Sequence, residues 1–137
     1  MSHPVFADTA YYLALISPRD LFHTRAVEIS RNLAEPIVTS AWVVQELADG
    51  LCSPPGRPGF LRLFDTLQAD LQTTLVEPDP ILWRRGLSLY RSRPDKGWSL
   101  TDCLSFEIMR GWGITRALTT DHHFTQAGFV ALLGPSS

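Results

Sequence analysis

The chain has 137 residues, of which 45% are hydrophobic and 19% are charged, a composition that builds a folded domain with its own core and excludes a disordered tail. The formal net charge is -2 and Lys96 is the only lysine, which argues against a protein that holds nucleic acid mainly by charge. Neither a membrane span nor a signal peptide is visible, and Cys52 and Cys103 lack metal-ligand spacing, so we expect a reduced, cytoplasmic protein without membrane contact.

The first half of the chain predicts alternating strands and helices. They are a strand over residues 3–7, a helix over about 9–15, a helix over about 18–33, a strand over 36–40 and a helix over about 41–51. Asp8 ends the first strand. Ser17 as N-cap and Pro18 at the first helical position predict the start of the second helix, and Ser40 is the predicted cap of the third.

The second half continues the alternation after a loop rich in proline and glycine. The predicted elements are this loop over residues 52–59, a helix over about 60–69, a strand over 73–78, a helix from Asp79 to about Arg91, a helix capped by Ser99, a strand over 115–120 and a short strand or tail over 129–133. The order predicts an α/β domain with a mostly parallel sheet and helices on both faces. Ligands bind beyond the carboxyl ends of the strands in such sheets.

Four acidic residues interrupt otherwise apolar segments: Asp8, Glu46, Asp102 and Asp121. Each has a purely structural alternative. Asp102, at the third position of its helix, suits the helix dipole, and Asp8 and Asp121 suit caps or turns. Glu46 would equally suit the solvent-exposed face of a helix.

Two strand ends, one helix start and the second turn of another helix can also lie together at one edge of the sheet. Carboxylates gathered there repel one another, and a divalent cation removes that penalty. Carboxylate oxygens suit Mg²⁺ or Mn²⁺, and no cysteine and histidine cluster points to zinc. Acidic metal sites of this kind drive phosphodiester hydrolysis.

Four stretches carry a resemblance to a known family: "FADTAYYLAL", "TSAWVVQEL", "WSLTDCLSF" and "ALTTDHHFTQAGF". In this order they resemble a PIN domain, specifically a VapC-type toxin ribonuclease of a type II toxin–antitoxin system. The first stretch departs from the commoner Asp-Thr-Ser by having Ala10 in place of serine.

The resemblance implies a PIN-like three-layer α/β/α sandwich with a central, mostly parallel sheet, forming a single nuclease domain over residues 1–137. It implies catalytic and metal-binding roles for Asp8, Glu46, Asp102 and Asp121, with Asp8 and Asp102 as direct ligands and Thr101 or Ser99 as auxiliary residues. It further implies Mg²⁺-dependent or Mn²⁺-dependent cleavage of RNA, a homodimer and a cognate antitoxin. The alternative is a catalytically inactive PIN-fold module that binds a partner protein.

Several other residues remain open. His122 and His123 are either ligands or, as we favour, surface turn residues, and Asp49 either assists the site or is solvated. A basic patch either guides RNA or simply forms the solvent-exposed face of a helix. It consists of Arg84, Arg85, Arg91 and Arg93. A set of large apolar side chains predicts an exposed partner surface, or else a thick core: Tyr11, Tyr12, Leu21, Phe22, Trp42 and Val43.

Overall fold

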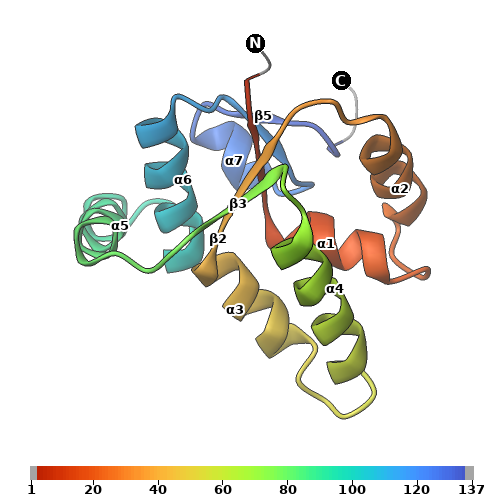
Figure 1. Cartoon of the computed structure of the whole chain (residues 1–137). Coiled ribbons are helices and arrows are strands. Elements are labelled where there is room, and N and C mark those ends of the chain that lie inside the picture. Colours follow the sequence, from red (N-terminus) through yellow and green to blue (C-terminus); the bar gives the residue numbers. More distant parts are fainter. Residues whose placement is uncertain (1–2, 135–137) are drawn as a thin grey trace.

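A parallel sheet of five strands forms the centre of the computed structural model, which describes residues 3–134 (Figure 1). The strands are β1 (Val5–Ala7), β2 (Ile37–Ser40), β3 (Thr73–Val76), β4 (Arg116–Leu118) and β5 (Val130–Ala131). Their order is β3-β2-β1-β4-β5, so that β1 lies in the middle and pairs with both β2 and β4. In this register Phe6 lies opposite Val38 on one side and Ala117 on the other.

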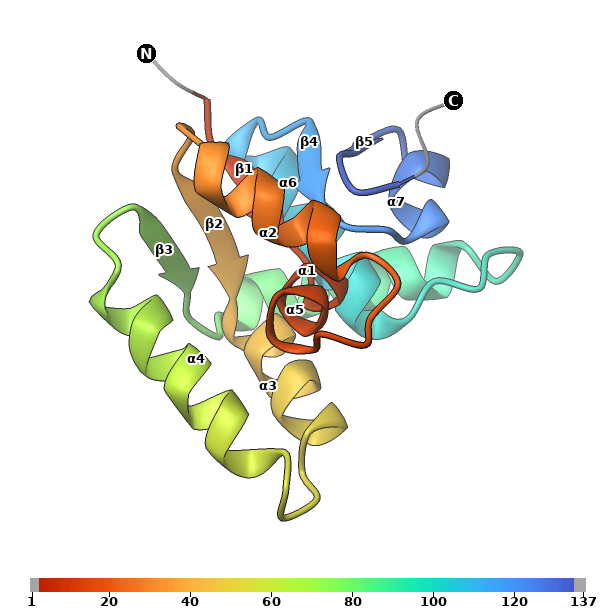
Figure 2. The same cartoon turned by 90° about the vertical axis from the view of Figure 1, so that its right-hand side faces the viewer.

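Helices cover both faces of the sheet. They are α1 (Thr9–Ile16), α2 (His23–Asn32), α3 (Ala41–Gly50), α4 (Arg57–Ala69), α5 (Pro80–Ser92), α6 (Leu100–Trp112) and α7 (His122–Gln126). Figures 1 and 2 show α1 and α2 on one side of the sheet, α5 and α6 on the other, and α3 and α4 extending past the strand ends. The predicted three-layer α/β/α sandwich is confirmed. Within residues 3–134, none of the helices has the length and apolar character that crossing a membrane requires.

The predicted helix caps form as the sequence indicates. The hydroxyl of Ser40 accepts a hydrogen bond from the backbone N–H of Val43, and the carboxylate of Asp79 accepts one from Ile81. Ser99 Oγ accepts a bond from the N–H of Asp102, and the Asp102 carboxylate accepts one from the N–H of Ser99. Such reciprocal pairs satisfy donors that a helix start leaves free.

Two helix starts differ from the prediction. The second helix begins at His23 rather than Pro18, because the side chain of Asp20 accepts a hydrogen bond from the N–H of Phe22 and closes a turn before the helix. The predicted loop over residues 52–59 is shorter than expected. Helix α4 already begins at Arg57, with a proline in its first turn, where no N–H is needed.

The early aromatic residues belong to the core. The prediction that Tyr11, Tyr12 and Val43 are exposed for a partner is wrong, because their exposed fractions are 2%, 2% and 0%. Tyr11 and Tyr12 contact each other with ring centroids 5.2 Å apart. Leu21 is 89% exposed. The alternative of a thick core therefore holds for the three buried residues.

Candidate functional site

The four acidic residues come from four elements near the carboxyl ends of the central strands. Asp8 follows β1 directly, and Asp121 follows the neighbouring β4 after a short extended segment. Asp102 lies in the first turn of α6, and Glu46 lies on α3, which begins directly after β2. The parallel register of β1, β2 and β4 brings these segments to the same edge of the sheet.

Asp8 is a buried acid without a cationic partner. Its side chain is not used to cap α1; instead Oδ2 accepts a hydrogen bond of 2.8 Å from the hydroxyl of Thr119. Burial, together with the smaller effect of the charges of Asp102 and Glu46, raises the pKa of Asp8 to about 7. Hydrogen bonds from the Thr119 hydroxyl and the Thr9 backbone oppose this rise. Within residues 3–134, Asp8 forms no ion pair.

Asp102 joins the start of α6 to the site. Besides the N–H of Ser99, its Oδ2 contacts Nδ1 of His123 at 3.0 Å. Burial raises the pKa of Asp102, the two hydrogen-bond partners oppose that rise, and the nearby carboxylate of Asp121 adds to it. Asp102 therefore serves as a helix cap and as a member of an acidic group, so the two interpretations of this residue are compatible.

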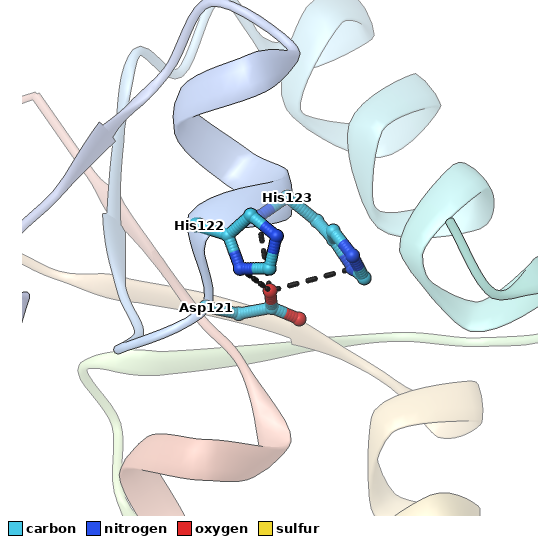
Figure 3. Close-up of side chains that lie close together, drawn as sticks. All are labelled: Asp121, His122 and His123. Atoms are coloured by element: carbon cyan, nitrogen blue, oxygen red, sulfur yellow. Dashed lines mark hydrogen bonds and ion pairs between the residues drawn. The ribbon is translucent and has the colours of Figure 1, made fainter. Parts of the chain in front are cut away.

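Asp121 lies between the end of β4 and two imidazoles. Its Oδ1 caps α7 by accepting a bond of 2.9 Å from the N–H of His123. The same oxygen lies 3.3 Å from Nδ1 of His123 and 3.7 Å from Nδ1 of His122, and both rings surround it in Figure 3. His123 therefore bridges Asp102 and Asp121, and the structure places it in the site rather than on a surface turn. The side chain of His122 is 73% exposed.

The remaining predicted residues lie at the rim of the site. Glu46 is exposed and accepts a hydrogen bond of 2.6 Å from the hydroxyl of Thr9, the residue that follows Asp8. Glu46 also lines a cavity of about 300 Å³ together with Asp49 and Thr101. Ser99 is occupied by its cap with Asp102.

The donor set fits a hard divalent cation in its chemistry. Carboxylate oxygens are the ligands that Mg²⁺ and Mn²⁺ prefer, and an uncompensated buried acid such as Asp8 gains most from a nearby positive charge. Across residues 3–134, the tightest group of three ligand atoms is formed by Asp121, His122 and His123, which lie within 4.8 Å of one another. No three of the four predicted acids come that close together in the described part of the chain.

Two residues of this arrangement were missed or misplaced by sequence reasoning. Thr119 donates to Asp8 and its Oγ1 also accepts a bond of 3.0 Å from the N–H of Asp121, so it links two of the acids. Its position at the end of a predicted strand was the available signal. The prediction that His123 is a surface turn residue is wrong, because the sequence does not show which way a short helix turns its side chains.

Comparisons with known proteins agree with this fold. A family model described as the PIN domain matches residues 5–130. The crystal structure of VapC20 from Mycobacterium tuberculosis, described as a sarcin-ricin loop cleaving toxin, superposes with a TM-score of 0.84 at 23% identity, covering 92% of this chain and 96% of that one. FitAcB from Neisseria gonorrhoeae gives 0.64 at 18% identity, covering 93% and 94%. No curated protein matches the sequence. Because the PIN model spans nearly all of the described residues, the chain belongs to the PIN domain family.

Proposed function

We propose that this protein is a metal-dependent endoribonuclease, the toxin of a toxin–antitoxin pair, and that residues 1–137 form its single nuclease domain. The observation that carries the proposal is the buried carboxylate of Asp8, held with a pKa raised to about 7 beside other acids and without a cationic partner. Membership of the PIN domain family supports the proposal, and so does the likeness in fold to a toxin that cleaves RNA.

The residues that we propose to carry catalysis and metal binding are Asp8, Glu46, Asp102 and Asp121. Asp8 and Asp102 are the proposed direct ligands, because both are nearly buried and burial disfavours their charged forms until a cation is near. When bound, Mg²⁺ or Mn²⁺ supplies Lewis-acid chemistry that offsets charge on the phosphodiester and makes water a better nucleophile.

His123 is a proposed positioning residue. A carboxylate only accepts hydrogen bonds, so when Asp102 is ionised, Nδ1 of His123 must carry the proton that lies between them. The imidazole then fixes the directions of Asp102 and Asp121 toward each other. Thr119 has the matching role for Asp8, because its hydroxyl donates to Oδ2 and so fixes the direction of the carboxylate.

The proposed protein partners are an antitoxin and a second copy of the chain. Large apolar side chains on the surface support such interfaces, and Leu21 is the one among them that the sequence also indicated. They are Leu21, Leu61, Leu71, Ile81, Trp83, Leu87, Tyr90, Trp112 and Val130.

A cleavage assay tests the enzyme directly. The purified protein is incubated with RNA in Mg²⁺, in Mn²⁺ and in excess chelator, and Asp102→Asn is compared with Asp65→Asn, which removes the same charge from the exposed face of α4. We expect cleavage in either metal, none in chelator, and loss only in Asp102→Asn. Cleavage that continues unchanged in chelator would contradict the metal requirement, and no cleavage in any condition would favour the inactive interaction module.

A further inference from the structure

A basic cavity lies beside the acidic site, between the end of α5 and the loop that leads into α6. Its volume is about 850 Å³. Three cationic side chains line it, those of Arg91, Arg93 and Lys96, and no acidic residue does. In a chain with a net charge of -2, such a local excess of positive charge indicates an anionic ligand.

The cavity shares a wall with the acidic site. Gly97 and Ser99 both line it, and the N–H of Ser99 donates to the carboxylate of Asp102. A Cβ atom built on Gly97 would lie 3.8 Å from Nε2 of His123, the ring that bridges Asp102 and Asp121. A ligand in the cavity would therefore contact Gly97 and Ser99, which lie directly against His123 and Asp102.

The loop that forms this wall is anchored. Trp98 is only 5% exposed, its ring contacts Phe106 edge-on with centroids 5.1 Å apart, and its Nε1 donates to Gln126 of α7. Arg93 lies over the Trp98 ring at 5.2 Å and forms two hydrogen bonds to Asp95. The cavity thus has a rigid base, which favours binding without a large ordering cost.

Two of the three cations are left available for a ligand. Among the described residues, Arg91 and Lys96 form no ion pair with an acid, whereas Arg93 is paired. Tyr90, at the rim, is 52% exposed and presents an aromatic ring next to Arg91. Cations interleaved with exposed aromatic rings are the usual means of holding single-stranded nucleic acid, because phosphates pair with the cations and bases stack on the rings.

We infer that this cavity binds the single-stranded segment of an RNA substrate next to the bond that is cut, with Arg91 and Lys96 on phosphates and Tyr90 stacked on a base. The inference rests on the proposed ribonuclease function and adds the substrate subsite. A single strand is required, because a base within a duplex is already stacked and has no free face for Tyr90.

Binding without cleavage tests the inference. The affinity of a short, fluorescein-labelled, single-stranded RNA of mixed sequence is measured by anisotropy in excess chelator over a series of salt concentrations. We expect the double variant Arg91→Gln/Lys96→Gln to lower the slope of log affinity against log salt by about 1.4, since each lost phosphate contact removes about 0.7. Arg31→Gln, which removes a charge from exposed α2 on the opposite side of the sheet, should bind as the native protein does.

Tyr90 is tested at constant salt. Tyr90→Ala should weaken RNA binding about five-fold or more, whereas Tyr90→Phe keeps the ring and should bind nearly normally. A polyglutamate peptide carrying the same charge as the RNA should bind more weakly and should not respond to Tyr90→Ala.

Three results overturn the inference: an unchanged salt slope in the double variant, equal effects of Tyr90→Ala and Tyr90→Phe, or equal affinity for polyglutamate and RNA. Failure of the proposed function gives a different result. The native protein would then bind RNA through Arg91 and Lys96 in chelator and still leave it intact when Mg²⁺ is added.

Discussion

Replacing Asp8 by asparagine should stabilise the metal-free protein, and increasingly so at higher pH. The folded-state pKa of about 7 lies roughly three units above the usual 3.8, which corresponds to a cost of about 4 kcal/mol for keeping the carboxylate ionised in the fold. The stability that the protonated form contributes is fully present below about pH 4 and is lost as the pH rises through about 7. Asparagine is neutral throughout, and its carbonyl oxygen can still accept the Thr119 hydrogen bond.

The assay is urea unfolding of the native protein and Asp8→Asn in excess chelator. Linkage gives an expected gain in the free energy of unfolding of about 2 kcal/mol at pH 5 and about 4 kcal/mol at pH 8, as upper values. Asp65→Asn on α4 controls for the change in net charge. Saturating Mg²⁺ or Mn²⁺ should reduce this difference at pH 8 to about 1 kcal/mol, because only the native site gains binding free energy, about 2.7 kcal/mol at a hundred times the dissociation constant.

A gain that is the same at both pH values, or a loss of stability at pH 8, would refute the reasoning. The first result would mean that Asp8 titrates normally and is not desolvated in the fold. The second would mean that a cation already compensates Asp8. Native stability that does not respond to metal would show that the carboxylate is buried for a structural reason alone.

Three further outcomes are expected from substitutions elsewhere. Asp102→Asn should reduce RNA cleavage below detection while circular dichroism shows the fold intact, and retained cleavage would mean that the residue is only a helix cap. His123→Ala should lower the cleavage rate by about 10-fold to 100-fold, as is usual for residues that orient ligands, whereas His122→Ala should have little effect on the same rate. Gly86→Ala should lower the free energy of unfolding by about 1–3 kcal/mol, because the added Cβ would lie 2.5 Å from Cδ2 of Leu104 on α6. Gly111→Ala should not lower it, because no atom lies within 4 Å of the Cβ added there.

The elements of the fold were predictable because local signals agree with the tertiary arrangement. Ser99 and Asp102 are three residues apart, the spacing of a capping box, so the start of α6 and the burial of its acid follow from the sequence. The start of α2 could not be predicted from the sequence, because Ser17 and Pro18 suit a turn as well as a helix start. In the structure the side chain of Asp20 closes that turn. Local patterns cannot choose between two conformations that both satisfy them.

The site itself was only half predictable, because its contacts join distant parts of the chain. Thr119 and Asp8 are 111 residues apart in sequence, and only the pairing of β4 with β1 brings them into contact. The strand-end positions of the acids could be read from the sequence, but the hydroxyl that binds one of them could not.

The same carboxylates cap helices and form the site, and this double use has a physical basis. A helix start presents free N–H groups and positive potential, which lower the cost of holding a carboxylate at a fixed position in a nearly dry environment. Asp102 and Asp121 both accept such N–H groups, and their pairing through His123 fixes their directions. Asp8 forms no side-chain cap of α1, and burial raises its pKa to about 7. Burial raises the pKa of both Asp8 and Asp102, so the charge of each is favoured by a nearby cation.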